Sequence, residues 1–415
     1  MSANPRKDFE DRRRRVMEAT ALHEPDRVPV IPVMEAFPIY YGGGTVRQIL
    51  ADYRVGEAWF DKFFADFKPD LGWDPVMFYP ARFLEIIGLT WLRWPGKHID
   101  EPNGMYQFIE GEYMKADEYG EAAFDPTQFM LQRWFPRSFS NLTGLAKLSF
   151  RNAMWAGYMG TISAFGDPEV KATLARCMEA ADLINEWFAY LDRYRRKMEE
   201  QFGIPLAYAN SAFAPFDMVG DTMRGTEAVL IDMIERPAEL LAYIDKVAEF
   251  ALQDQIRAAT TTGRPWVWFW LHKGGDEFMS DQQYARFYWP SLKRYVEGLV
   301  AAGLTPVLYC EGSYNTRLKY LRELPRGRVI CDFEYIDMAR AKKELGDVAC
   351  IAGNVPNVLL AHGSRQEVVD CTRRLIDTCA PGGGFMLDTG ALVDDAKPEN
   401  LMAIFETAET YGRKG

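Results

Sequence analysis

Apolar runs of strand length alternate with segments of helical period along most of the chain. The runs are short, bounded by turn residues, and cover 28–35, 70–77, 205–213, 266–272, 305–312, 328–335, 349–355 and 384–391. Segments of helical period lie between the later runs and after the last one, at 225–262, 281–303, 314–323, 337–345, 364–378 and 397–412. Eight strands in this order predict the α/β class, as a single parallel (β/α)8 TIM barrel.

Two parts of the chain lie outside this alternation. Residues 1–24 are compatible with a helix and predict an N-terminal helical extension, in which the run Arg12–Arg15 would be a solvated face. Residues 25–415 would form the barrel. Within it, residues 90–165 are irregular and rich in aromatic residues, Gly and Pro, which predicts a long insertion after the second strand. Insertions of this length often serve as lids or substrate walls. The clearest helix follows at 168–202.

An open, doubly wound sheet is the competing architecture. Such a sheet usually carries a glycine fingerprint for phosphate binding after its first strand. No GxGxxG motif follows the run 28–35, and no GxxxxGK motif followed by Ser or Thr occurs in the chain. The closed barrel is therefore favoured.

Composition and charge limit the kinds of partner. Hydrophobic residues make up 48% of the chain and charged residues 26%, which is enough to bury a sizeable core and excludes a mainly disordered chain. The formal charge of -11 argues against nucleic acid and anionic membranes as partners and favours a small molecule or a protein.

No apolar run could span a membrane and the polar start shows no signal-peptide pattern, so a cytoplasmic protein is expected. Whether the protein forms a homodimer stays open.

The predicted strand ends nominate a site. In parallel barrels, catalytic groups lie at the carboxyl ends of the strands and in the loops that follow them. The polar residues at these positions are Glu35, Asp74, Asn210, His272, Tyr309, Glu311, Asp332, Glu334, Asn354, Asp388 and Thr389, with Lys273 directly after His272. Crowded carboxyl groups raise one another's pKa values, which is how an enzyme obtains a general acid near neutral pH.

A metal site is not favoured by the spacing of ligand residues. The six cysteines form no CxxC pair, so reduced thiols are expected. Cys310 beside Glu311 resembles half of a metal site, but no second Cys or His stands at ligand spacing. His272 is one of only four histidines and ends a very apolar run, so a structural role and a catalytic role both stay open for it.

Several stretches, taken in this order, resemble the uroporphyrinogen decarboxylase superfamily, over about 25–413. The superfamily includes the porphyrin-pathway decarboxylase and corrinoid-dependent methyltransferases. The resemblance rests on PDRVPVIPVME near the start, SAFAPFDMVGDTMRG (211–225), MSDQQYARFYWPSLKRYVEGL (279–299), PVLYCEG (306–312), IAGNVPNVLL (351–360) and GGGFMLDTGALVDDAKPENLMAIFETAETYG (382–412). It implies a single (β/α)8 barrel, which agrees with the strand count.

Departures from the superfamily's patterns bear on function. The zinc methyltransferases carry a His-x-Cys-Gly motif where this chain has Tyr309 to Gly312, and a further Cys where it has Ala391, so the resemblance implies no zinc here. The porphyrin-pathway decarboxylase holds substrate carboxylates with two arginines, where this chain has Glu35 and Ile39. The catalytic Asp of that decarboxylase aligns only with Asp74 or Met77 of this chain. An anionic tetrapyrrole would therefore face acidic groups.

The leading hypothesis is a corrinoid (cobalamin)-dependent methyltransferase that moves a methyl group from a small, methoxylated or aromatic substrate to cobalt, either on a separate corrinoid protein or in free cobalamin. Removing methyl from an ether requires an acid to protonate the leaving oxygen. His272, Tyr309 and Glu311 are the candidates for this acid. Substrate binding is assigned to Glu35, Asp74, Asn210, Lys273, Glu334, Asn354 and Asp388, and the aromatic residues of 91–113 would close over the substrate.

Two alternatives belong to other functional classes. A decarboxylase or lyase acting on a smaller carboxylic acid would need a cation to hold the carboxylate, and Lys273 or Arg224 could serve. A non-catalytic ligand-binding barrel is disfavoured by the number of titratable groups at the strand ends.

Overall fold

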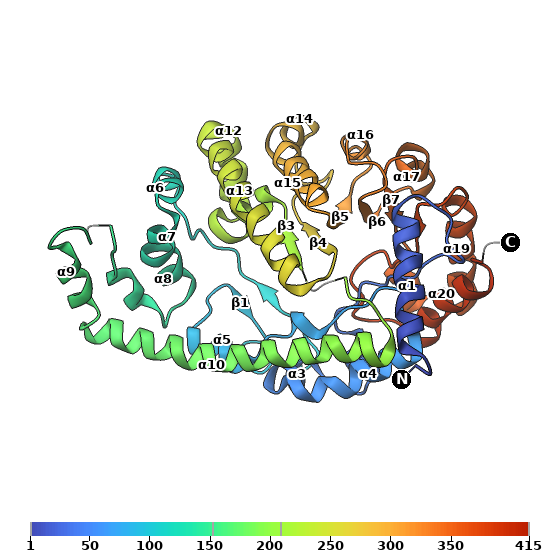
Figure 1. The fold of residues 1–415 in the computed structure, drawn as a ribbon, viewed down its shortest axis with the longest axis horizontal. Coiled ribbons are helices and arrows are strands. Elements are labelled where there is room, and N and C mark those ends of the chain that lie inside the picture. Colours follow the sequence, from blue (N-terminus) through green and yellow to red (C-terminus); the bar gives the residue numbers. More distant parts are fainter. Residues whose placement is uncertain (1, 152, 208–209, 414–415) are drawn as a thin grey trace.

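The barrel is built from short parallel strands wrapped by helices (Figure 1). The computed structural model describes residues 2–151, 153–207 and 210–413. Six strands form one parallel sheet in chain order: β3 (Ser211–Phe213), β4 (Trp266–Leu271), β5 (Thr305–Ser313), β6 (Ile330–Tyr335), β7 (Cys350–Ala352) and β8 (Phe385–Met386). Each of these strands coincides with part of a predicted run, and only β5 extends past its run, by one residue.

Two further segments complete the ring. Their regular backbone pairing is too short for them to be assigned as strands. Val30 forms a parallel bridge to Leu387, directly after β8, and Met34 forms another to Val393. The Asp70 amide donates to the Val30 carbonyl, and Gly72 bridges to Leu206 in the run that leads into β3. The predicted first and second strands therefore connect β8 back to β3, as a (β/α)8 barrel requires.

Helices cover the outside of the barrel. The first half contributes α1 (Pro5–Thr20), α2 (Phe37–Tyr41), α3 (Val46–Ala51), α4 (Gly56–Phe67) and α5 (Ala81–Ile87). The second half contributes α11 (Pro215–Val219), α12 (Thr226–Glu235), α13 (Pro237–Thr262), α14 (Asp281–Gln283), α15 (Trp289–Ala301), α16 (Leu318–Leu321), α17 (Met338–Leu345), α18 (Asn357–His362), α19 (Arg365–Cys379) and α20 (Pro398–Thr410). Among the described residues, no helix combines the length and the apolar composition that crossing a membrane requires.

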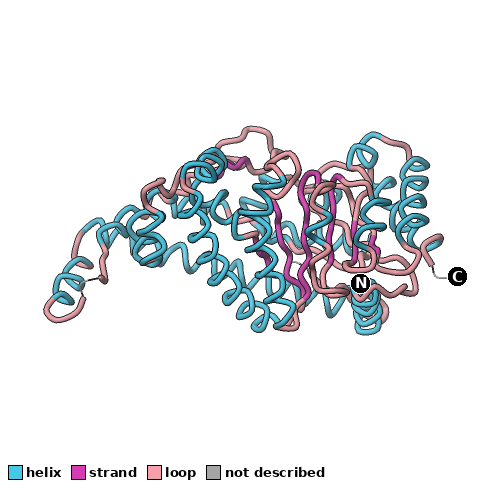
Figure 2. The backbone as a smooth tube through the Cα atoms, turned by 90° about the horizontal axis from the view of Figure 1, so that it is seen from above, coloured by secondary structure: helices cyan, strands magenta, loops and turns pink. Residues whose placement is uncertain are grey.

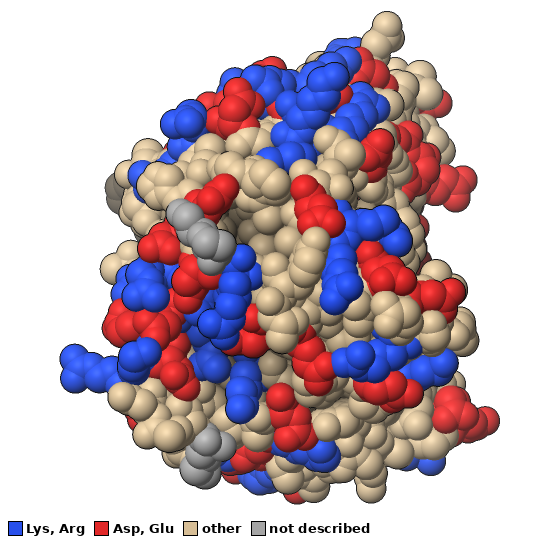
Figure 3. Space-filling model, turned by 90° about the vertical axis from the view of Figure 1, so that its right-hand side faces the viewer, with Lys and Arg blue, Asp and Glu red and all other residues tan. Residues whose placement is uncertain are grey.

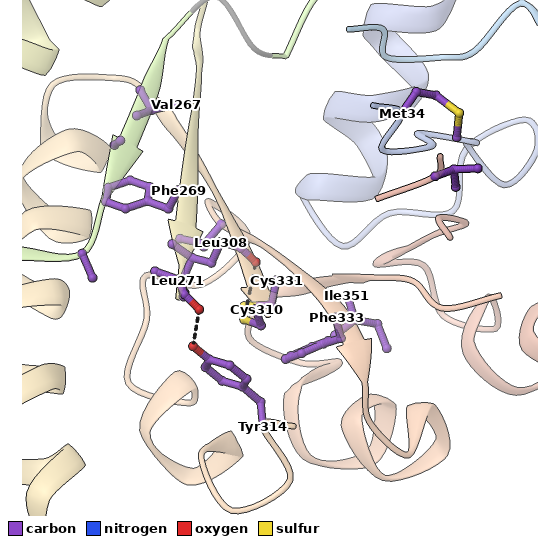
Figure 4. Close-up of a cluster of buried hydrophobic side chains, with 14 of the residues drawn as sticks. Met34, Val267, Phe269, Leu271, Leu308, Cys310, Tyr314, Cys331, Phe333 and Ile351 are labelled. Carbon is purple, nitrogen blue, oxygen red and sulfur yellow. Dashed lines mark hydrogen bonds between the residues drawn. The ribbon is translucent and has the colours of Figure 1, made fainter. Parts of the chain in front are cut away.

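The alternation of side chains along the strands divides the core in two. Residues such as Phe269, Leu308 and Phe333 point outward and pack against the helices (Figure 4). In the same layer the Tyr314 hydroxyl donates to the Leu271 carbonyl at 3.3 Å. The alternate residues, among them Trp268, form a separate cluster inside the barrel. A strand buried on both faces must be apolar throughout, which is why β4 reads as one continuous apolar run.

The insertion is irregular in its first part and helical in its second. It contains the hairpin β1 (Leu92–Arg93) and β2 (Gln107–Phe108), then α6 (Tyr119–Phe124), α7 (Pro126–Phe129), α8 (Phe135–Ser138) and α9 (Gly157–Ala164), and the long α10 (Pro168–Lys197) follows it. Most of these helices are four to eight residues long, too short for a helical period to show in the sequence. Residues 119–180, called the arm below, extend away from the barrel (Figures 1 and 2).

The long helix α10 has the boundaries that its sequence predicts. The Asp167 side chain accepts from the Glu169 amide at 2.8 Å, and Pro168 takes the first helical position. A π-helical turn, Met198–Phe202, continues the helix to Gly203, whose φ of 65° favours glycine.

The prediction for the arginine run was wrong in part. Arg12 and Arg15 are buried, because positions three apart share the face of α1 that packs on the barrel. Arg12 donates to the carbonyls of Phe202 and Gly203, and Arg15 donates to Asp70 at 2.6 Å. Two of the four arginines therefore fix the N-terminal helix against the barrel.

The surface charge is mixed. On the face seen in Figure 3, basic and acidic side chains are interspersed over most of the surface, and several basic side chains gather at its upper edge.

Candidate active site

The alternation of inward-facing and outward-facing side chains continues past the ends of the strands. It therefore determines which residues line the site. His272 follows Trp270 two positions on, Glu311 follows Tyr309, and Glu334 follows Asp332. Trp270 and Tyr309 belong to the interior cluster. Side chains two positions further along the same strand therefore point into the opening at the carboxyl ends, which is called the mouth below.

His272 is held on both ring nitrogens. Its Nδ1 lies 2.7 Å from Asp221 Oδ2, and its Nε2 lies 3.5 Å from Glu311 Oε1. Burial alone would lower the pKa of His272, but the hydrogen bond to Asp221 and the charges of Glu311, Asp221 and Asp217 outweigh burial and raise the pKa to about 9. The imidazole is therefore protonated at neutral pH and carries a proton on Nε2, the nitrogen on the Glu311 side.

Two aspartates that hold this strand end were missed in the sequence. Asp217 on α11 and Asp221 in the π-helical turn Gly220–Arg224 lie four residues apart, so both face β4. Asp217 is fully buried and accepts from the His272 amide at 3.0 Å, the Lys273 amide at 3.1 Å and the Tyr288 hydroxyl at 2.6 Å. The spacing of two carboxylates at i and i+4 directly after the third predicted strand was the available signal.

The mouth also carries acidic groups whose pKa values are raised. Burial and the charges of Asp394 and Glu311 raise the pKa of Glu35 to about 8. Burial also raises the pKa of Glu311, to about 6, although the charge of His272 opposes this rise. Near neutral pH, Glu35 is therefore mostly protonated and Glu311 mostly ionised, so the mouth offers both donors and acceptors to a ligand.

Tyr309 lies below the mouth rather than in it. It is 1% exposed, packs against the rings of Trp268 and Trp270, and donates to Glu334 Oε1 at 2.9 Å. Glu334 Oε2 accepts from the Gly312 amide at 2.7 Å, where a φ of 79° favours glycine. Burial raises the pKa of Tyr309 well above its ordinary value. Tyr309 therefore orients Glu334 and is poorly placed to be the acid.

We expect Tyr309→Phe to destabilise the protein by about 1 kcal/mol, the usual net value of one hydrogen bond. Loss of this donor also raises the pKa of Glu334 further. Chemical denaturation at pH 7 measures the change. Tyr335→Phe on the neighbouring strand β6 is the matched control, because that side chain is 64% exposed and should show no change. An equal effect of the two substitutions would contradict the role of the hydrogen bond.

A carboxyl pair lies deeper in the barrel. Asp332 on β6 and Asp388 after β8 flank β7, where Ala352 pairs with Asp332 and leaves room for both side chains. No donor of another described residue reaches either oxygen of Asp332 or Oδ2 of Asp388. Burial together with the charge of Asp388 raises the pKa of Asp332 well above its usual range. The pair therefore keeps one proton at neutral pH.

This proton belongs to Asp332. Asp388 Oδ1 accepts from the Val33 amide at 2.9 Å and from the Thr389 amide and hydroxyl. These donors stabilise the ionised form of Asp388, whereas Asp332 has no such donors. Asp388 therefore acts as a structural acceptor that ties the first strand segment to β8, rather than as a group open to a substrate.

Two other predicted binding residues are also engaged in the fold. Asp74 caps the turn at Pro75 through the Val76 amide and pairs with Arg195 of α10. Asn210 lies before the end of its strand, because β3 continues to Phe213, and its amide group donates to the carbonyls of Arg264 and Trp266. The position predicted for Asn210 was therefore wrong.

Asn354 stands at the mouth, but its amide group is already used. Its Nδ2 donates to the carbonyls of Glu334 and Ile336, at 3.1 and 3.2 Å, and thereby joins the ends of β6 and β7. A role in orienting substrate would require these two hydrogen bonds to break.

Lys273 and the insertion complete the rim. Lys273 Nζ lies 2.6 Å from Asp221 Oδ1 and 4.0 Å from Glu110 Oε1. The Thr226 amide donates to Glu110 Oε2 at 3.2 Å, and the amides of Tyr113 and Met114 donate to the Met223 carbonyl. The segment 110–114 is therefore fixed beside the mouth, next to the residues that position His272.

Within the described ranges, no group of three or more His, Cys, Asp or Glu side chains is arranged to hold a metal ion. Cys310 is fully buried and belongs to the outward-facing layer of β5 (Figure 4). Its thiol therefore points away from Glu311, because neighbouring residues of a strand face opposite sides.

Comparison with known proteins places this barrel in a family. The uroporphyrinogen decarboxylase (URO-D) family matches residues 194–411, which is more than half of the chain and includes His272, Glu311 and Glu334. The chain belongs to the URO-D family. No curated protein sequence matches it.

Solved structures align with this URO-D family member to different extents. A methyltransferase from Methanosarcina mazei aligns with a TM-score of 0.62 and 13% identity, over 96% of this chain and 98% of that one. A B12-independent methionine synthase from Shewanella sp. W3-18-1 aligns with a TM-score of 0.37 and 11% identity, over 53% of this chain and 66% of that one. The first likeness supports the TIM barrel fold.

Proposed function

We propose that this protein is a corrinoid-dependent methyltransferase that takes a methyl group from a small methoxylated or aromatic substrate. The observation that carries the proposal is the placement of His272, which is charged, held by Asp221 and directed with Nε2 toward the mouth. An ether oxygen is a poor leaving group unless it receives a proton as the bond breaks. His272 supplies that proton at neutral pH.

The proposed reaction needs only one proton from the protein. The carbon–oxygen bond of the ether breaks, the methyl carbon bonds to the reduced cobalt of the acceptor, and the leaving oxygen takes the proton at His272 Nε2. The corrinoid supplies a cobalt nucleophile that no amino acid side chain can replace. Glu311, 3.5 Å from Nε2, stabilises the imidazolium before transfer.

The barrel interior bears on where such an acceptor would lie. Trp268, Trp270 and Tyr309 fill the space below the mouth. A corrin ring therefore fits only above the strand ends, as an acceptor brought by a partner protein or free in solution. Zinc-assisted thiol chemistry is not part of the proposal, because Tyr309, Glu311 and Ala391 occupy the positions of the zinc ligands in the similar methyltransferases.

The structure weakens the decarboxylase alternative. Both cations that could hold a substrate carboxylate already have acidic partners. Lys273 pairs with Asp221, and Arg224 pairs with Asp232 at 2.6 Å and with Glu112. An incoming carboxylate would have to displace these partners and would also face Glu311.

Mixing the protein with cob(I)alamin and 2-methoxyphenol, a neutral methoxylated aromatic, tests the proposal. We expect the absorption spectrum of methylcobalamin to appear together with catechol. His272→Gln is the matched control and should give neither product at a comparable rate. Carbon dioxide release from carboxylated aromatics, without methyl transfer, would favour the decarboxylase. Binding of the aromatic with no reaction would favour a ligand-binding barrel.

A further inference from the structure

We propose that residues 153–162, together with Phe150, form a contact surface between two copies of this chain. The segment lies at the tip of the arm, far from the barrel (Figures 1 and 2). It includes most of α9, a helix with no buried residue.

The surface is unusually apolar for one that is exposed. The exposed fractions are 51% for Phe150, 77% for Met154, 93% for Trp155, 56% for Tyr158, 58% for Met159 and 66% for Ile162. No charged residue occurs between 152 and 166. A helix that is apolar on all sides is normally buried, so this one lacks its covering partner within the described part of its own chain.

The charged residues near this surface are not arranged for binding to a membrane. Helices that lie in the membrane interface combine an apolar face with free Lys and Arg on the polar face. Here Arg151 pairs with Asp125 at 2.9 Å, and Lys147 pairs with Asp167 at 2.9 Å. Both cations are therefore neutralised within the arm, and the chain's net charge of -11 opposes anionic lipid. A protein is the better match.

A second copy suits the size and shape of the surface. Three exposed aromatic and three exposed aliphatic side chains offer roughly 700 Å² of apolar area, given about 150–250 Å² for each aromatic residue. A stable interface needs about 800 Å² from each partner. The exposed small residues Ala156, Gly160 and Ser163 lie between the large ones, and a side chain at Gly160 would meet only open space. The helix therefore offers both protrusions and recesses to an identical helix related by a two-fold axis.

Sedimentation velocity at micromolar concentration tests the proposal. We expect the wild-type chain to sediment as a dimer and Trp155→Asp to weaken dimerisation at least ~30-fold, because exposed tryptophans dominate such contacts. Ile234→Asp is the matched control: Ile234 is 77% exposed on α12, away from the arm tip, and its replacement should leave the dimer intact. Circular dichroism verifies that each variant is folded.

A second measurement covers the case in which Trp155→Asp fails to fold. Met159→Cys should form a disulfide between two chains under mild oxidation, and Ile234→Cys should not. The proposal is overturned if the wild-type chain sediments as a monomer, if the dimer survives Trp155→Asp, or if Met159→Cys does not cross-link. Binding of the monomer to neutral phosphatidylcholine vesicles would overturn it in favour of a lipid surface.

Discussion

His272→Gln lowers the rate constant of methyl transfer by about 10²- to 10⁴-fold, the usual contribution of a positioned general acid. Glutamine keeps a polar side chain of similar reach but cannot deliver a proton. The affinity for the aromatic substrate should change little, because the proton is needed only as the bond breaks. Single-turnover kinetics with excess cob(I)alamin separates the two effects.

The same prediction specifies how the rate of methyl transfer should change with pH. An acid acts in its protonated form, so the wild-type rate should fall as the pH rises through about 9, the pKa of His272. His362→Gln is the matched control, since that exposed side chain ends α18, and its profile should equal that of the wild type. A His272→Gln rate within threefold of the wild type would remove His272 from the mechanism.

Asp388→Asn destabilises the protein by about 3 kcal/mol or more, whereas Asp332→Asn leaves it at least as stable as the wild type at pH 7. Removing one partner of a buried charged pair typically costs about 3–5 kcal/mol. In Asp388→Asn the buried charge moves from a carboxylate with several donors to Asp332, which has none beyond its partner. In Asp332→Asn the amide NH₂ replaces the acidic proton and donates to Asp388.

The same pair predicts how stability depends on pH. Because the folded-state pKa of Asp332 is raised, the wild type loses stability as the pH rises above about 3.9, where the unfolded chain releases this proton. The advantage of Asp332→Asn over the wild type should therefore grow from pH 4 to pH 7. Chemical denaturation across this range measures it. Equal destabilisation by the two substitutions would contradict the assignment of the proton.

The strand-end rule brings several candidate residues to one opening because the interior alternation is local. Once the run 266–272 is taken as a strand, Trp270 and His272 share a face, and only one further assumption, the parallel barrel, brings His272 to the same opening as Glu311. The structure also brings Glu35 to this opening, where the charge of Glu311 contributes to the rise in its pKa.

The remaining residues depended on contacts that no local pattern contains. Asp74 is neutralised by Arg195, more than a hundred residues away on the long helix. The Asn210 amide group donates to the carbonyl of Arg264 in the loop before β4, and the residue lies before Phe213, where both the predicted run and β3 end. Asp221 lies on a helix rather than at a strand end, so a rule restricted to strand ends omits the group that most directly holds His272.

The charge state of His272 is the claim on which the proposed chemistry depends most. With only four histidines, the imidazole signals of selectively ¹³C-labelled protein can be assigned by substitution and followed as the pH changes. The structure predicts a pKa of about 9 for His272 and a fall toward the ordinary value of about 6.5 in Asp221→Asn. A wild-type pKa near 6.5, unaffected by Asp221→Asn, would contradict the account.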